Sequence, residues 1–406
     1  MVSRKVKLAL PCIGADALGM GLKEMQWSAA EIAYAWDVDP SLLPLLLAAH
    51  GPIGLGGLSS GVGHGGDILA FEVASMQRVD FLVSGPPCPP FSSIGLRGGA
   101  CADDREKVFR KVTEMIAHQG RLGAYGFILE MVPGILNSRP HQLGHHNYYD
   151  EWLCHLQSVA PMFRVHTWQL QSSDYLPQHR LRLYTVGIHR ALAPRHGLVP
   201  PSPLRQFADR VDLEDLLHQG LCPIDEGVLT PQQRVNLSVI KQQLVSEPTG
   251  PGGSISCFAV DRDPHKLWCS GIRHGFVGTL RTHDELVWLL KADAHGRTVL
   301  SRCLHPVERF LLQGFRPEVA LFFSKADGMR VSGNSFTVPV ITHAFHQLLM
   351  CCMTSDTFGF PDVPLPLIHR SRESILDLLH RARLLNMERA GVAVLERELT
   401  LLSRRR

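Results

Sequence analysis

A cysteine and a glutamate each follow a short apolar run in this 406-residue chain. Cys88 comes after the run 81–84 and a turn that Pro86 and Pro87 make rigid. Glu130 comes directly after the run 127–129. Such runs are typical of buried parallel strands, and ligands bind beyond the carboxyl ends of those strands. The pattern predicts a thiol nucleophile and a carboxylate acid or base; the alternatives are a merely buried cysteine and a capping or ion-paired glutamate.

Two arginines alternate with leucines in the stretch 178–188, which predicts a half-buried strand. The alternation places Gln178, Arg180 and Arg182 on one face of that strand. Two guanidinium groups on one face suit a phosphate or a base that carries a carbonyl group. An edge strand with solvated arginines is the alternative interpretation.

The N-terminal elements indicate a nucleotide-binding βαβ unit. A strand at 6–10 is followed by a turn around Gly14, a helix at 17–25 and a second strand at 31–36. A plain tight turn explains Gly14 equally well, because a full GxGxxG is lacking. Asp37 ends the second strand, where a ribose hydroxyl pair is usually held, although a capping role is the alternative. Asp67 follows a glycine-rich stretch and would accept a hydrogen bond from an adenine amino group or cap the next helix.

Composition narrows the class of protein. The chain is 45% hydrophobic and 19% charged with a formal net charge of +3, so it can bury a large core and permits an anionic partner. Ten cysteines include no CxxC pair, which argues for reduced thiols and against a disulfide scaffold or zinc ribbon. No run of eighteen apolar residues exists, and Pro11 interrupts the apolar start, so we expect neither a membrane span nor a signal peptide. The expected location is soluble and intracellular, or nuclear in a eukaryote.

Five sequence blocks, in order and at similar spacing, resemble the DNA (cytosine-5)-methyltransferases between residues 6 and 352. The blocks are Pro86-Pro87-Cys88 with Phe91-Ser92, Glu130-Met131-Val132, Gln178-His179-Arg180-Leu181-Arg182, Gln313-Gly314-Phe315 and Gly333-Asn334-Ser335-Phe336-Thr337-Val338-Pro339. The resemblance implies an α/β fold: a Rossmann-like, S-adenosylmethionine-dependent methyltransferase with a mostly parallel sheet plus a small irregular target-recognition lobe. It also implies double-stranded DNA as the partner.

The same resemblance assigns roles to residues. Cys88 would add to C6 of a cytosine flipped out of the helix, and Glu130 would hold or donate a proton at N3. Arg182 would bond O2, and Arg180 would help to place the loop and the nucleophile. The substrate-binding group comprises Pro86, whose carbonyl would read the exocyclic amine, with Ser92, Gln178 and Thr279. The cofactor-binding group comprises Ile13, Gly14, Asp37, Asp67, Asn334 and Ser335, and no metal is expected.

The resemblance also implies a division of the chain. Residues 1–188 would form the catalytic lobe that binds S-adenosylmethionine, and 189–328 the target-recognition lobe, which is rich in arginine and histidine. Residues 329–354 would return to complete the catalytic lobe. Beyond them, 355–406 reads as a proline-dotted linker and amphipathic helices that would pack on the core or on a protein partner.

Several positions depart from the family's pattern. The first block, usually Phe-x-Gly-x-Gly-Gly, appears as residues 10–15, without its aromatic residue and two of its glycines. Pro89, Met131 and Val307 replace the usual Gln, Asn and Arg of three other blocks. The altered first block leaves open a catalytically silent relative that binds DNA or a partner methyltransferase. A tRNA cytosine-5 methyltransferase is a second alternative, because the fold and the nucleophile are shared within this resemblance.

Overall fold

The computed structural model describes residues 5–24, 30–42, 44–46, 67–87, 104–137, 144–192, 212–217, 226–246, 255–265, 272–282, 286–292 and 297–353. The chain divides into two compact units. The first unit takes Met1–Gln171, Leu181–Pro203 and Val338–Ile368, and the second takes Ser172–Arg180, Leu204–Thr337 and His369–Arg406. In the described part of the chain, no helix has the length and hydropathy needed to cross a bilayer.

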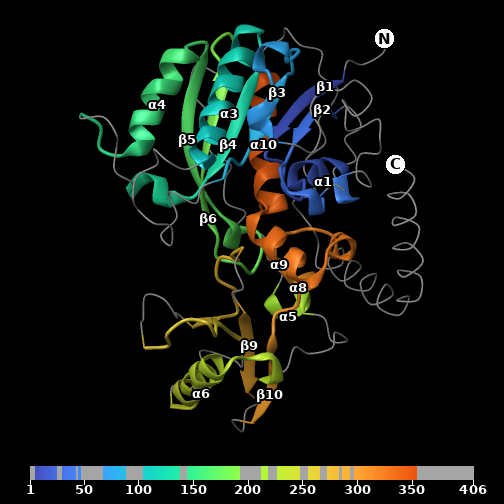
Figure 1. The fold of residues 1–406 in the computed structure, drawn as a ribbon, viewed down its shortest axis with the longest axis vertical. Helices are drawn as coiled ribbons and strands as arrows, with labels where there is room; N and C mark the ends of the chain where they lie inside the picture. The colour runs from blue at the N-terminus through green and yellow to red at the C-terminus, as the bar shows by residue number, and fades with distance from the viewer. Residues whose placement is uncertain are drawn as a thin grey trace. The chain divides into compact units, whose positions relative to one another are not determined.

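The first unit contains a six-stranded sheet in the order β2-β1-β3-β4-β6-β5 (Figure 1). The β1–β2, β1–β3 and β3–β4 pairs are parallel, whereas β6 runs antiparallel to both of its neighbours. This arrangement confirms the α/β class and the mostly parallel sheet. The strands are β1 (Val6–Pro11), β2 (Ala30–Trp36), β3 (Phe81–Ser84), β4 (Gly126–Met131), β5 (Phe163–Gln171) and β6 (Leu181–His189).

Helices cover both faces of this sheet (Figure 1). On one face Leu82 and Phe127 share a core with residues of α3 and α4. On the other face the ring of Phe81 meets that of Phe345 from α10 at a centroid distance of 5.4 Å. The helical elements are α1 (Ala17–Glu24), η1 (Pro40–Leu42), η2 (Ile68–Ala70), η3 (Val73–Ser75), α3 (Asp104–Arg121), η6 (Pro133–Asn137), α4 (Tyr148–Val159) and α10 (Val338–Met353).

The late helix α10 packs closely on the early helix α1. A Cβ atom added at Gly21 would lie 1.9 Å from Oγ1 of Thr342, so only glycine fits at this contact. Residues more than 300 positions apart therefore lie side by side in the first unit. The lobe boundaries inferred from the family resemblance stay a prediction.

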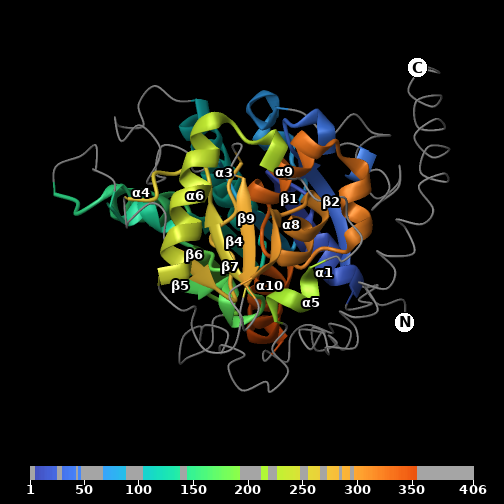
Figure 2. The same ribbon diagram turned by 90° about the horizontal axis from the view of Figure 1, so that it is seen from below.

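The second unit contains a four-stranded antiparallel sheet in the order β10-β9-β7-β8. This sheet was not predicted from the sequence. Helix α6 lies beside it (Figure 2), with Leu237 and Ile240 in one core with Phe258 and Trp288. The elements are η7 (Ser172–Asp174), α5 (Leu213–Leu216), η8 (Glu226–Val228), α6 (Pro231–Ser246), β7 (Ser256–Ala259), β8 (Arg273–His274), β9 (Val287–Ala292), β10 (Thr298–Cys303), α8 (Pro306–Leu312), η9 (Pro317–Phe322) and α9 (Lys325–Asn334).

One sequence expectation is wrong in its extent. The strand expected at 178–188 begins at Leu181 as β6, and Gln178 forms an isolated bridge to Val277 instead. The amide of His179 donates to the Val277 carbonyl at 2.8 Å, so the backbone is engaged by another segment before the strand starts. Arg180 therefore does not share a strand face with Arg182.

Candidate active site

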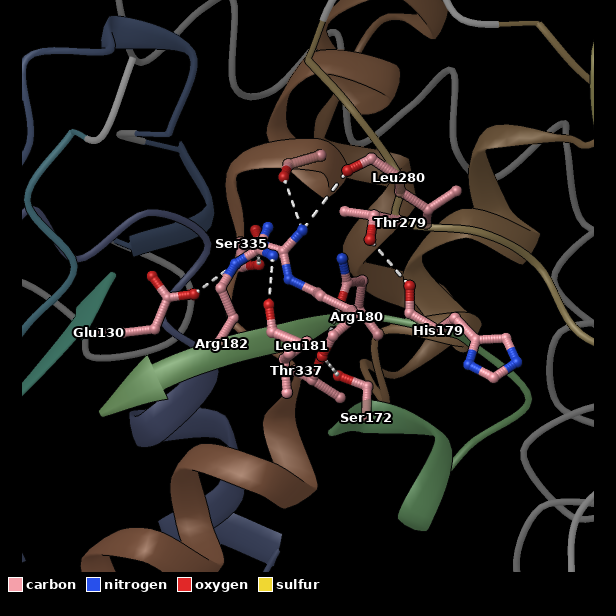
Figure 3. A network of polar contacts seen from close by, with 12 residues as sticks. Glu130, Ser172, His179, Arg180, Leu181, Arg182, Thr279, Leu280, Ser335 and Thr337 are labelled. Carbon is pink, nitrogen blue, oxygen red and sulfur yellow. Dashed lines mark hydrogen bonds and ion pairs between the residues drawn. The ribbon is translucent and has the colours of Figure 1, made fainter. Parts of the chain in front are cut away.

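Glu130 and Arg182 form an ion pair between neighbouring strands. Glu130 lies on β4 and Arg182 on β6, and Arg182 Nε is 2.8 Å from Glu130 Oε1 (Figure 3). Their side chains are only 9% and 12% exposed, and Arg182 Nη1 also donates to the Leu181 carbonyl at 2.8 Å. A carboxylate this buried needs a cation or hydrogen bonds, and Arg182 supplies the cation. The pair presents a carboxylate and a forked donor together.

The turn after β3 leaves the sheet beside that pair. Ser84, the last residue of β3, is in register with Leu129, so the Pro86 turn and Glu130 begin at neighbouring strand ends. The Ser84 hydroxyl donates to the Pro11 carbonyl at 2.6 Å, which ties the end of β3 to the end of β1. Pro86 is buried. The predicted nucleophile Cys88 and the predicted substrate contact Ser92 lie outside the described residues.

The predicted ribose site brings the turn after β1 and the end of β2 together. The amide of Ile13 donates to the Trp36 carbonyl at 3.0 Å, and that of Gly14 donates to Asp37 Oδ2 at 2.9 Å. Oδ1 of Asp37 accepts from the Asp39 amide at 3.0 Å. Burial raises the pKa of Asp37, although its hydrogen bonds with backbone amides oppose this effect.

Those contacts fit a neutral ligand that donates hydrogen bonds. Among the described residues, no cation forms an ion pair with Asp37, and each of its oxygens retains accepting capacity beside the backbone bond. A Cβ atom added at Gly14 would meet nothing within 4 Å, so the turn is open on that side. The hydroxyl groups of a ribose donate hydrogen bonds, which the carboxylate oxygens of Asp37 accept.

Left-handed backbone occurs in this turn at residues other than glycine. Cys12 has φ of 54° and Asp16 has φ of 57°, beside Gly14 at 57°. Cys12 occupies the position of the first glycine in the family's opening block. Cys12 therefore adopts the left-handed conformation although it is not the residue that adopts it at least cost.

Asp67 caps a short helix. Its Oδ1 accepts from the Leu69 amide at 2.9 Å at the start of η2, and the residue is exposed. Capping was one of the two roles that the sequence left open. Binding of an adenine amino group stays a prediction.

An aromatic cluster beside Asp37 was missed in the sequence. The ring of Trp36 stacks on that of Tyr34 at a centroid distance of 5.4 Å and meets the Phe71 ring at 4.9 Å. The buried Trp36 Nε1 has no hydrogen-bond partner among the described residues. The sequence pattern that could have predicted this cluster is the spacing of Tyr34 and Trp36, which places both on one face of the strand.

Arg180 binds the backbone of the second unit. Its Nη2 donates to the Ser335 carbonyl at 2.9 Å, and its Nη1 donates to the carbonyls of Gly333 and Leu280 at 3.2 and 3.4 Å (Figure 3). Arg180 is 3% exposed. These contacts hold the Leu280 segment and the end of α9 together, whereas the role of Arg180 toward the loop and the nucleophile stays a prediction.

The remaining candidates also belong to the second unit. Thr279 Oγ1 donates to the His179 carbonyl at 2.8 Å. Gln178 is fully buried, and neither polar atom of its side-chain amide has a partner among the described residues. Asn334 is the exposed last residue of α9, and Ser335 follows it as the C-cap. Ile13, Gly14 and Asp37, with which the last two were grouped, belong to the first unit.

Comparison with protein families gives a match across most of the chain. The sequence profile of the C-5 cytosine-specific DNA methylase family matches residues 14–350. The type II methyltransferase M.NlaX of Neisseria lactamica is 33% identical over 286 residues, which are 70% of this chain and 80% of that protein. M.MspI of Moraxella sp is 30% identical over 71% of this chain, but the match spans only 60% of that enzyme.

Solved structures share the fold. A DNMT2 variant from Spodoptera frugiperda superimposes with a TM-score of 0.53 at 16% identity, covering 85% of this chain and 100% of that one. A putative DNA modification methyltransferase encoded within an E. coli prophage gives 0.52 at 16% identity, with coverage of 86% and 100%. At this identity the likeness concerns the fold alone.

Proposed function

Because the chain belongs to the C-5 cytosine-specific DNA methylase family, we propose that it methylates C5 of cytosine in DNA through a covalent adduct with Cys88. The observation that carries the proposal is the Glu130–Arg182 pair beside the Pro86 turn that leads to Cys88. It supports the proposal because a carboxylate and a forked donor lie together at the strand ends from which that turn leaves the sheet. S-adenosylmethionine would supply the methyl group as an electrophilic carbon on its sulfonium.

Nucleophilic attack at the neighbouring carbon activates C5. The Cys88 thiolate forms a bond to C6, and the electron pair of the C5–C6 double bond moves into the ring, where a proton at N3 neutralises it. Glu130 holds or delivers that proton, and Arg182 donates to O2 and stabilises the same charge. C5 would then bond to the methyl group, and the electron pair of the broken methyl–sulfur bond would stay on the sulfur of S-adenosylhomocysteine. Loss of the C5 proton to solvent re-forms the C5–C6 double bond and expels Cys88 as the thiolate, and N3 returns its proton to Glu130.

The pair of Glu130 and Arg182 suits this task because each orients the other. Arg182 lies within 2.8 Å of one oxygen of the carboxyl group, which leaves the second oxygen of Glu130 for the base. The Leu181 carbonyl holds one end of the guanidinium group through Nη1. Preorganised donors of this kind stabilise developing charge without rearranging during the reaction.

Asp37 is the residue that we propose for the ribose hydroxyls of S-adenosylmethionine, with Ile13 and Gly14 lining the turn. The open space beside Gly14 and the absence of a cation paired with Asp37 among the described residues support this assignment. The family resemblance also assigns Asp67, Asn334 and Ser335 to the cofactor. It assigns Pro86, Ser92, Gln178 and Thr279 to the substrate. Gln178, Thr279, Asn334 and Ser335 belong to the second unit, and their roles stay predictions.

Methyl transfer from labelled S-adenosylmethionine to mixed-sequence DNA, and separately to bulk tRNA, tests the proposal. We expect label in DNA with the wild-type protein and none with Cys88→Ser, while the exposed Cys154→Ser serves as the matched control. Label in tRNA alone would transfer the function to the tRNA alternative. Binding of DNA without label in either acid would identify a silent relative and contradict the proposal.

A further inference from the structure

Two buried arginines hold neighbouring carbonyl groups of one segment in the second unit. Arg180 Nη1 donates to the Leu280 carbonyl at 3.4 Å, and Arg309 Nη2 donates to the Arg281 carbonyl at 2.7 Å. The two arginines are 3% and 1% exposed. Hydrogen bonds from a charged donor are stronger than neutral ones, particularly away from water. Consecutive peptide groups are thereby fixed from two sides.

Helix α9 packs directly against the backbone of Arg281. A Cβ atom added at Gly333 would lie 2.3 Å from both the carbonyl carbon and the oxygen of Arg281, so the two backbones touch. Arg309 also donates through Nε to Ser332 Oγ at 3.0 Å and through Nη2 to the Met329 carbonyl at 3.1 Å. Arg309 therefore ties this helix to the segment that passes over it.

The residues just before the arginine contacts are fixed as well. We call 272–282 the clamped segment. Thr279 Oγ1 donates to the His179 carbonyl at 2.8 Å, and the His179 amide donates to the Val277 carbonyl at the same distance. Gly275 has φ of 73°, a left-handed conformation that turns the chain out of β8. Hydrogen bonds therefore hold the clamped segment at Val277 and Thr279, just before the carbonyl groups that the two arginines bind.

The clamped segment exposes two groups suited to reading hydrogen-bond patterns. Arg273 and His274 form β8, an edge strand of the second sheet, and both are exposed. The buried Ser256 hydroxyl lies 3.1 Å from His274 Nδ1, which fixes the ring and leaves Nε2 for a ligand. Within the described part of the chain, Arg273 has no ion-pair partner. The pKa of His179 is lowered by the burial of its own ring and, to a smaller extent, by the charge of Arg273.

We propose that Arg273 and His274 determine which DNA sequences this chain selects, and that Arg309 is the positioning residue that fixes them. The inference rests on the proposed function, which makes DNA the substrate. In the major groove of DNA an arginine bonds guanine O6 and N7. The nitrogens of a histidine ring donate to or accept from a base edge. Such contacts discriminate only when the backbone that carries them is rigid, and the two buried guanidinium groups provide that rigidity.

Selection of bound duplexes from a random-sequence DNA pool, followed by sequencing, tests this without requiring methyl transfer. The full chain is compared with Arg273→Gln, His274→Gln, Arg309→Met and Arg309→Lys. Arg234→Gln is the matched control, because Arg234 is an exposed arginine of the same unit on α6. The melting temperature of each variant is measured in parallel.

We expect the wild-type protein and Arg234→Gln to enrich one motif. Arg273→Gln should weaken the preference at one or two positions by about 5- to 150-fold, which is the value of one bidentate base contact. Arg309→Met should flatten the preference at several positions, and Arg309→Lys should recover part of it because a donor to Arg281 returns. If Arg309→Met fails to fold, the exposed Arg273 and His274 variants still decide the question.

The inference is overturned if Arg273→Gln and His274→Gln enrich the wild-type motif to the wild-type extent, or if the wild-type protein binds DNA without any sequence preference. A motif that Arg273→Gln alters, in a protein that transfers no methyl group, would refute the proposed function and support this inference. The two failures are therefore distinguishable.

Discussion

Arg182 Nε lies 2.8 Å from Glu130 Oε1, so a cation and a carboxylate from neighbouring strands share one end of the sheet. The register of β3 with β4 brings the turn that precedes Cys88 to the same strand ends. The proposed acid Glu130 and the proposed donor Arg182 thus lie on adjacent strands, and the turn that precedes Cys88 leaves the strand next to them.

Replacing Glu130 by Gln tests its role in the chemistry. The amide keeps the size of the side chain but holds no acidic proton, so we expect kcat to fall by about 10²- to 10⁴-fold, the range typical of a lost acid or base. The KM for DNA should change much less, because the proton is needed mainly as Cys88 adds. Steady-state methyl transfer over a range of DNA concentrations measures both quantities, and a kcat within threefold of the wild type would contradict the role.

Replacing Cys12 by Gly should stabilise the protein. Left-handed backbone at a residue with a Cβ costs about 1–2 kcal/mol, whereas glycine adds about 0.5–1 kcal/mol of unfolded-chain entropy. The expected net gain is about 0.5–1 kcal/mol in the free energy of unfolding, measured by urea denaturation. Cys12→Ala keeps the Cβ and should show no gain; equal stability of the two variants would refute the argument.

Replacing Gly21 by Ala should separate α1 from α10. The added methyl group would lie 1.9 Å from Thr342 Oγ1, an overlap whose relief costs about 1–3 kcal/mol of stability even after the better helix propensity of alanine. Adding Thr342→Ala should restore much of the loss, because the nearest atom is gone. Thermal unfolding of the two single variants and the double variant measures the coupling, and additive losses would show that the two residues do not clash.

Lowering the pH should destabilise the first unit, because α10 carries a histidine whose pKa is lowered in the folded protein. Burial, with a smaller contribution from the neighbouring His346, lowers the pKa of His343 to about 4 from the usual 6.5. Between those values the unfolded chain binds more protons than the folded one, so the free energy of unfolding falls as the pH falls through this window.

The variant His343→Gln isolates that contribution. Its unfolding free energy should depend less steeply on pH between about 4 and 6.5, by less than about 1.4 kcal/mol per pH unit because His343 is half-buried. His155→Gln, at an exposed position on α4, should keep the wild-type slope. Identical slopes for all three proteins would show that His343 titrates alike in both states.

The elements that the sequence predicted well are those that local pattern specifies. Apolar runs identified β3 and β4, and the order of strand, turn and strand placed Asp37 beside Gly14, where the 2.9 Å hydrogen bond confirms their proximity.

The features that sequence analysis did not predict depend on contacts between residues that are far apart in the chain. Arg180 looked like a strand residue, but its guanidinium group binds carbonyls 100 to 155 positions away, which no local pattern reveals. Strand β8 has only two residues and owes its existence to pairing with β7. Arg309 had no expected role, because its acceptors Arg281 and Met329 come together only in the folded second unit.

The most direct test of the central claim is covalent trapping on duplex DNA that carries 5-fluorocytosine. Fluorine at C5 leaves no proton to lose after methylation, so the bond between Cys88 and C6 should persist through denaturation. We predict a denaturation-resistant protein–DNA complex that requires S-adenosylmethionine, forms with Cys154→Ser and is absent with Cys88→Ser. A complex that persists in Cys88→Ser, or none with a wild-type protein that methylates ordinary DNA, would contradict the account.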